Sequence, residues 1–167
     1  MIETNRLILK PLSYEQLIKY IRTDRSLETE LGVNHVQRVI SPELQEALEQ
    51  TILPNVADTS KNYLFSTLWT LIAKDINMMV GDICIVGEPN AEGEIEIGYG
   101  TYQEFENKGF MTEAVGGIIG WAKTQANVRA VCASTEKQNS ASFRVLIKNN
   151  FVKIAQNESL FYWKLTL

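Results

Sequence analysis

A strand, a glycine turn and an apolar helix follow one another in the middle of the chain and constrain its fold most. Residues 96–101 (Glu-Ile-Gly-Tyr-Gly-Thr) favour a strand, and residues 106–112 turn at Gly109. An apolar helix that reaches Trp121 begins there. The first N–H groups of a helix have no partner within it, and the helix dipole is positive at that end, so the turn suits an anion such as a phosphate.

This signal alone leaves two interpretations open, because Gly109 and Thr112 are also ordinary residues at the start of a helix. The chain has no Gly-x-x-x-x-Gly-Lys-Ser/Thr motif, and the turn holds a single Gly where a dinucleotide fingerprint needs three. The turn at Gly109 is therefore either a phosphate-binding turn of another kind or an ordinary helix start.

A second segment has a similar layout. Residues 131–136 alternate as a strand does, and residues 143–151 favour a helix with one apolar face. Asn139 or Ser140 would cap that helix. The two segments together predict two strands that each lead into a helix.

With both segments in view, the chain resembles the GNAT superfamily of acyl-CoA-dependent N-acetyltransferases, and most closely the branch that acetylates N-termini of ribosomal proteins. Four stretches carry this resemblance, in the family's order and across most of the chain. Residues 3–12 match its first strand, T-x-R-L-x-L-R-P, residues 96–99 match E-I-G-Y, residues 108–114 match G-K-G-Y-x-T-E-A, and residues 139–151 match N-x-x-S-x-x-V-L-x-K-x-G-F.

Four positions depart from the family pattern. Glu106 stands where the diphosphate loop usually has Arg or Gln, and Met111 replaces a small residue. Asn150 replaces the Gly before the last Phe of the motif, which Asn tolerates because it accepts left-handed backbone geometry. Leu146 occupies the place where many relatives carry the Tyr that protonates the leaving thiolate. The usual general acid is therefore absent.

The resemblance implies one GNAT-type N-acetyltransferase domain over residues 1–167, an α/β fold of the α+β type. It implies a mixed, mostly antiparallel sheet with splayed central strands near 95–101 and 130–135, flanked by helices. Acetyl-CoA would be the cosubstrate, with its pantetheine arm between these strands. The cofactor-binding residues so implied are Tyr99, Gly100 and Thr101 at the thioester, Asn107, Lys108, Gly109, Phe110, Met111 and Thr112 at the diphosphate, and Asn139 and Ser142 at the pantetheine arm.

The chemistry so implied is direct attack of a neutral amine on the thioester, through an oxyanion that backbone N–H groups stabilise. An amine of ordinary pKa is mostly protonated near neutral pH, so a base must take its proton. Glu96 and Glu158 are the candidate bases, directly or through water. The alternative for Glu96 is an outward-facing strand residue, and the alternative for Glu158, which the sequence favours, is a solvated turn carboxylate. Ser142 is the candidate proton donor to the thiolate, or it only positions the cofactor.

The acceptor stays open among a protein N-terminus, a polyamine, an aminoglycoside and a small metabolite amine. Family members select it with the region that is residues 13–62 here and with the terminal hairpin. That region has charges of both signs, which a solvated helix face explains as well as a substrate groove does. They are Arg22, Asp24, Arg25, Glu28, Glu30 and Arg38.

Two other functions remain: a degenerate acyl-CoA-binding module without turnover, favoured by Glu106 and Leu146, and a structural domain without a cofactor. The oligomeric state, including a homodimer, stays open as well.

Composition supports one domain and excludes several classes of protein. The 167 residues are 45% hydrophobic, enough for a substantial core, and the net charge of −4 with no Lys/Arg cluster argues against nucleic acid as a partner. No apolar run approaches the roughly 20 residues that cross a bilayer, and residues 1–6 lack the apolar core of a signal peptide. We therefore expect a cytoplasmic protein without a membrane partner.

A metal site is not expected. Cys84 and Cys132 lie in separate predicted strands without C-x-x-C spacing, and His35 is the only histidine. Zinc needs about four N or S ligands. Each Cys is most simply a small buried hydrophobic residue, and the distant His35 argues against a Cys–His nucleophile.

The remaining elements follow from periodicity and from helix-start and helix-stop residues. We predict strands at residues 6–12, 64–73, 78–86, 151–154 and 160–165, the last two as a hairpin, and helices at residues 13–21 and 41–52. Pro54 should end the helix at 41–52, because Pro cannot continue a helix.

Overall fold

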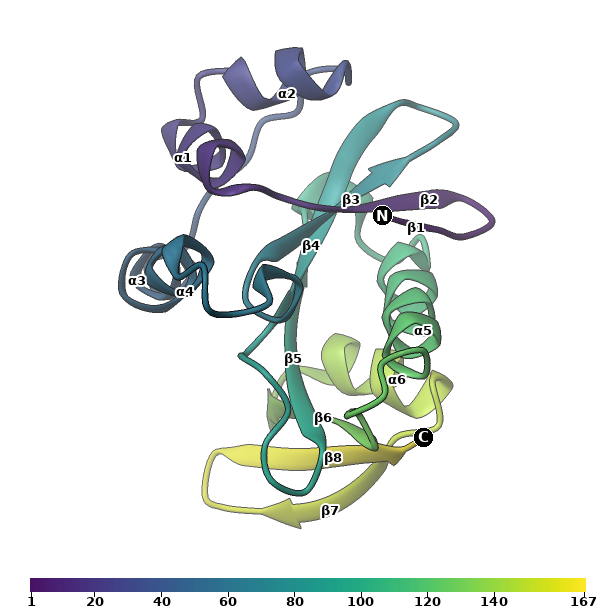
Figure 1. Cartoon of the computed structure of the whole chain (residues 1–167). Coiled ribbons are helices and arrows are strands. Elements are labelled where there is room, and N and C mark those ends of the chain that lie inside the picture. Colours follow the sequence, from purple (N-terminus) through teal and green to yellow (C-terminus); the bar gives the residue numbers. More distant parts are fainter.

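Eight strands form one sheet with helices on both faces in the computed structural model, which describes residues 1–167 (Figure 1). The strand order is β1-β2-β3-β4-β5-β6-β8-β7, and every neighbouring pair is antiparallel except β5 and β6. The predicted α+β fold with a mixed, mostly antiparallel sheet is confirmed. The strands are β1 (Ile2–Glu3), β2 (Leu7–Pro11), β3 (Leu68–Ala73), β4 (Met78–Ile85), β5 (Glu94–Thr101), β6 (Ala130–Glu136), β7 (Val152–Gln156) and β8 (Leu160–Thr166).

The helices divide between the two faces of the sheet. Helices α1 (Tyr14–Arg22), α2 (Ser26–Leu31), α3 (Pro42–Ala47) and α4 (Leu53–Ala57) lie on one side, whereas α5 (Phe110–Ala122) and α6 (Ser140–Lys148) lie on the other (Figure 1). Short 3-10 turns occupy Tyr63–Phe65 and Gln103–Phe105. No helix is long and apolar enough to cross a membrane.

Local sequence signals explain several of these boundaries. Ser13, the first residue of the helix predicted at 13–21, caps α1 as a full capping box with Gln16, and Ser41 caps α3 with Pro42 in its first turn. Asn150 adopts the expected left-handed conformation, with φ of 65°. Each of these signals acts within four residues, so the sequence alone predicts it.

Two of the predicted boundaries are wrong. The strand expected at residues 64–73 begins only at Leu68, because Asn62 caps a 3-10 turn just before it. Pro54 does not end the second helix. A π turn over Leu48–Ile52, in which Leu53 N donates to Leu48 O, joins α3 to α4, and Pro54, which has no N–H to donate, lies in the first turn of α4.

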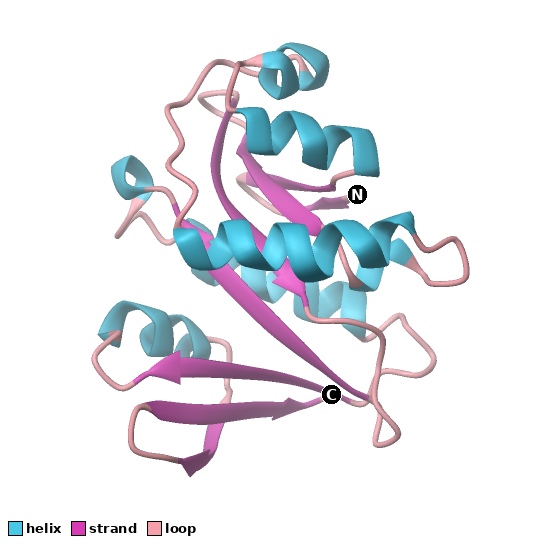
Figure 2. Ribbon diagram, turned by 90° about the vertical axis from the view of Figure 1, so that its left-hand side faces the viewer, coloured by secondary structure: helices cyan, strands magenta, loops and turns pink.

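The parallel pair β5–β6 leaves a wedge in the middle of the sheet. Its pairing covers only Glu94↔Ala130, Ile95↔Val131 and Glu96↔Cys132. Beyond these residues β5 continues to Thr101 beside β4, and β6 continues to Glu136 beside β8. The two strands therefore separate, as predicted, and the facing edges of residues 97–101 and 133–136 have no strand partner (Figure 2).

Helix α5 crosses the sheet beside this wedge and is mostly buried. Val115 and Ile118 are fully buried in the core, and Trp121 packs against Phe65 and Trp69 with ring centroids 5.0 and 5.4 Å apart. This packing fixes the end of α5 that lies far from Gly109. At the other end, Glu113 in the first turn of α5 accepts hydrogen bonds from Thr4 and Arg6, which precede β2.

Candidate functional site

A cavity of about 420 Å³ opens where β5 and β6 separate, between the start of α5 and α6. Ten of the eleven residues expected to bind the cofactor line it. They are Tyr99, Gly100, Thr101, Asn107, Gly109, Phe110, Met111, Thr112, Asn139 and Ser142. The other lining residues are Phe105, Glu106, Ala141, Arg144, Val145 and Lys148.

The loop before α5 presents unpaired backbone donors to this cavity. Asn107 and Gly109 both have positive φ, 60° and 78°, and this alternation curls the loop. The N–H groups of residues 107–112 donate to no backbone or side-chain acceptor, and Gly109 provides no side-chain cap. A row of free N–H groups in a curled loop at a helix start is an anion-binding arrangement.

Charged side chains surround these donors. Arg144 and Lys148 reach the cavity from α6, four residues apart on one helix face. Glu106 adds a carboxylate to the lining. Lys108 is not a lining residue, because its ammonium group lies over the Phe105 ring, 5.2 Å from the centroid. Sequence reasoning missed Arg144 and Lys148, although their i, i+4 spacing after a predicted cap was a usable signal.

Asn139, Ser142 and Tyr99 form a connected group at the wedge. The Asn139 side chain accepts a hydrogen bond from Ser142 N at 3.0 Å, so Asn139 is the helix cap. The Ser142 hydroxyl donates to the Tyr99 phenol at 3.1 Å, and that phenol donates to the Ser142 carbonyl at 2.9 Å. Burial raises the pKa of Tyr99 to about 12, although the hydrogen bond with Ser142 opposes the shift. The phenol therefore keeps its proton at neutral pH.

Glu96 lies at the point where the strands separate, and its side chain is exposed on the face opposite to Tyr99. The Ser134 hydroxyl donates to its carboxylate at 3.1 Å. Glu158 is in the exposed turn between β7 and β8, beside the end of β6, where Lys137 N donates to Ser159 O at 3.0 Å. Neither Glu96 nor Glu158 lines the cavity: Glu96 belongs to the last residue pair that joins β5 to β6, and Glu158 lies in the turn between β7 and β8.

The region expected to select an acceptor holds a buried ion pair. Glu28 and Arg38 pair at 2.9 Å with almost fully buried side chains, and the guanidinium lies over the Tyr20 ring. Tyr20 and Tyr102 both donate to one oxygen of the buried Asp82, at 2.7 and 2.8 Å. These charges therefore connect α1 and α2 to the sheet, so a solvated helix face does not explain Glu28 and Arg38.

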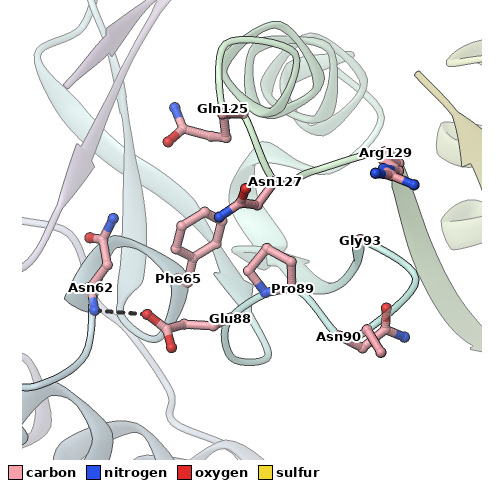
Figure 3. Close-up of a pocket in the computed structure, with 11 residues that line it drawn as sticks. Asn62, Phe65, Glu88, Pro89, Asn90, Gly93, Gln125, Asn127 and Arg129 are labelled. Atoms are coloured by element: carbon pink, nitrogen blue, oxygen red, sulfur yellow. Dashed lines mark hydrogen bonds between the residues drawn. The ribbon is translucent and has the colours of Figure 1, made fainter.

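A second hollow, of about 560 Å³, lies at the other end of α5 (Figure 3). It is lined by the turn between β4 and β5, by the loop after α5 and by Asn62 and Phe65. The Glu88 carboxylate accepts from Asn62 N at 3.1 Å (Figure 3). It is larger than the first cavity but holds none of the predicted site residues.

The cysteines offer no nucleophile at the wedge. Burial raises the pKa of both Cys84 and Cys132, so the thiols keep their protons at neutral pH. No group of three or more His, Cys, Asp or Glu side chains is arranged to hold a metal ion.

Comparison with known proteins gives a consistent result. The acetyltransferase (GNAT) domain matches residues 6–152. An uncharacterized N-acetyltransferase of Bacillus subtilis (strain 168), YjdG, is 26% identical over 166 residues, which are 98% of this chain and 96% of that protein.

Solved structures of low sequence identity share the fold. RimL, a ribosomal L7/L12 alpha-N-protein acetyltransferase, in complex with coenzyme A, has a TM-score of 0.68 at 14% identity, covering 98% of this chain and 96% of that chain. Mutant forms of the spermidine/spermine N-acetyltransferase SpeG from Vibrio cholerae have a TM-score of 0.63 at 12% identity, covering 96% and 95%. Because the family match spans most of the sequence, this chain belongs to the GNAT acetyltransferases and is an acyl-CoA-dependent N-acetyltransferase with acetyl-CoA as its cosubstrate.

Proposed function

We propose that the chain, as one domain over residues 1–167, transfers the acetyl group of acetyl-CoA to a primary amine by direct attack at the wedge between β5 and β6. The observation that carries this proposal is the row of free N–H groups at residues 107–112, beside two strand edges without partners. A diphosphate would accept from the N–H groups, and the amides of a pantetheine arm would pair with the free edge of β5.

The cations of α6 supply further attraction for the phosphates. Arg144 and Lys148 line the same cavity as the free N–H groups, whereas Lys108 points to Phe105. We therefore assign Lys108 a backbone role in cofactor binding. Asn139 and Ser142 border the pantetheine arm, and Tyr99, Gly100 and Thr101 border the thioester.

Glu96 is the base that we favour. Its carboxylate is exposed at the wedge and is oriented by Ser134, so an amine that approaches from the face opposite to α5 and α6 meets it before the thioester. Glu96, directly or through one water, takes the proton as the amine nitrogen attacks the carbonyl carbon. Backbone N–H groups at the free edge of β5 stabilise the oxyanion. Glu158 is the weaker candidate because it lies in a distant turn.

Ser142 is the candidate donor to the sulfur as the C–S bond breaks. Its hydroxyl is held by Tyr99 at the cavity, and Leu146, at the family's usual Tyr position, is fully buried and cannot donate. Tyr99 keeps Ser142 oriented while remaining protonated. Much of the acceleration would come from alignment of the amine with the thioester.

The acceptor class remains a proposal with two candidates. The structural relatives include an enzyme named for acetylation of protein N-termini and one named for acetylation of polyamines. We propose a protein N-terminus or a small-molecule amine, because Glu96 is an exposed strand residue at the point where β5 and β6 separate.

The alternative is a module that binds acyl-CoA without turnover. Glu106 in the cavity lining and the absence of a Tyr at position 146 favour it. Calorimetry with coenzyme A, followed by acetyl transfer to a panel of peptides and polyamines, separates the two. Micromolar binding, worth roughly 8 kcal/mol, together with transfer to any amine supports the enzyme. Binding without transfer would leave only the module, and no binding at all would contradict both.

A further inference from the structure

Arg6, at the start of β2, reaches the loop that precedes α5 although more than 100 residues separate them. Its guanidinium donates to the Lys108 carbonyl at 3.0 Å and to the Glu113 carboxylate at 2.7 Å. Its backbone N–H donates to the other oxygen of Glu113 at 2.6 Å. One residue between β1 and β2 therefore contacts both the loop and the first turn of the helix.

The carboxylate of Glu113 completes this connection. The Thr4 hydroxyl donates to it at 2.7 Å, in addition to both donors of Arg6. Partial burial would raise the pKa of Glu113, but these hydrogen bonds together with the Arg6 charge lower it below its usual value. Glu113 is therefore ionised at neutral pH and remains a strong acceptor for Arg6.

The guanidinium of Arg6 also contacts the turn itself. It lies over the Phe110 ring at 4.8 Å from the centroid. Its Nη2 atom makes no hydrogen bond and would be 3.4 Å from a Cβ built on Gly109. Arg6 does not line the cavity, so it contacts the loop without occupying the space of a ligand.

Hydrogen bonds that hold the loop are few: besides Arg6, the Asn149 amide donates to the Thr112 carbonyl at 3.0 Å, while Phe110 and Met111 are buried in the core. Asn107 and Gly109 have left-handed backbone geometry, and residues 107–112 donate no hydrogen bond within the protein. We propose that Arg6 is a positioning residue for the diphosphate: through Lys108 O, Phe110 and Glu113 it keeps these N–H groups aimed into the cavity. It also places a positive charge behind a loop that carries Glu106. This inference rests on the proposed placement of the diphosphate.

The test compares Arg6→Ala, Arg6→Lys and Gly109→Val with the unmodified protein. Calorimetry measures the affinity for coenzyme A, and ligand-observed NMR measures the affinity for pantetheine, which lacks the diphosphate. We expect Arg6→Ala to weaken coenzyme A binding about tenfold, to leave the affinity for pantetheine unchanged and to lower Tm only modestly. Arg6→Lys should recover part of the loss, because it keeps a donor and the charge.

The possible outcomes separate this inference from the proposed function. If Gly109→Val weakens coenzyme A binding and Arg6→Ala does not, the role of Arg6 is wrong and the diphosphate placement stands. An equal loss for coenzyme A and pantetheine in Arg6→Ala would indicate a general folding role and would also overturn the inference. Undiminished coenzyme A binding in both variants would contradict the diphosphate placement itself.

Discussion

The two ends of α5 carry hollows of comparable size and different chemistry. At the first end, N–H groups of residues 107–112 are unpaired and the cavity receives Arg144 and Lys148. At the other end, the last carbonyls of the helix already accept hydrogen bonds from Lys123, Thr124 and Gln125. The hollow there is the larger one and is lined by carboxamides, Glu88 and Arg129 (Figure 3). Unsatisfied donors and the sign of the helix dipole, rather than volume, distinguish the proposed ligand site from the other hollow.

The largest expected effect is that of Gly109→Val, which attacks the first end of the helix. A β-branched residue at φ of 78° is strained, and its side chain would approach Arg6. We expect the Kd for coenzyme A to rise about a hundredfold while the fold persists. The matched control, Arg129→Ala in the hollow at the other end, should leave this Kd unchanged. Equal losses in both variants would refute the distinction between the two ends.

Glu96→Gln should produce the next largest effect, on the rate rather than on cofactor affinity. Loss of the base should lower the rate at neutral pH about 10- to 100-fold, and the deficit should shrink at high pH as the amine loses its own proton. Glu88→Gln, which removes the carboxylate of the other hollow, is the control. If Glu96→Gln transfers the acetyl group as fast as the unmodified protein from pH 6 to pH 9, the base lies elsewhere.

Ser142→Ala should lower kcat about tenfold with a smaller change in the KM for acetyl-CoA, because it removes the proposed donor to the sulfur. The pKa of Tyr99 is raised to about 12, so the phenol stays protonated from pH 6 to pH 10 and should add no step to the rate profile in that range. Tyr99→Phe tests the orienting role of the phenol. If both variants keep the wild-type kcat, the thiolate takes its proton from water.

Glu106→Gln should give the smallest effect, in the opposite direction. Removing a carboxylate from the cavity lining should tighten coenzyme A binding about threefold, more at low ionic strength than at high, because salt screens the repulsion. Titrations at two salt concentrations measure this. A weaker affinity after the substitution would show that Glu106 supports the loop instead of opposing the phosphates.

Residues that act on their neighbours in sequence were predictable, and residues that act across the fold were not. Gly109, Ser13 and Asn139 set the start of a helix by local geometry, and each lies where the sequence suggests. The fold class followed from four motifs in order. The π turn before Pro54 was missed because Pro was expected to stop the helix, whereas a π turn lets the helical run continue past it.

The site shows the same division. The loop and the cap of α6 were visible as motifs. Arg6 and Glu113 each belong to a recognised motif as well, but no sequence pattern indicated that these two motifs contact each other in the fold. Alternation along β5 shows that Glu96 and Tyr99 lie on opposite faces of the strand. It does not show which face of the sheet each one occupies, because that depends on how the strand pairs with the others. Lys108 was expected at the diphosphate by its position, which stays a prediction for its backbone N–H, while its ammonium group lies over the Phe105 ring, a contact that no pattern predicts.

Only three residue pairs join β5 to β6, so backbone hydrogen bonding across the middle of the sheet is confined to a short seam. Strands β1 to β5 and strands β6 to β8 are therefore coupled mainly through side-chain packing and through the segments that connect them. A bound molecule whose amides bridge the open edges would lengthen that seam. Amide protons of the two halves should then exchange more slowly together, so that the cosubstrate acts as a mechanical part of the sheet as well as a reactant.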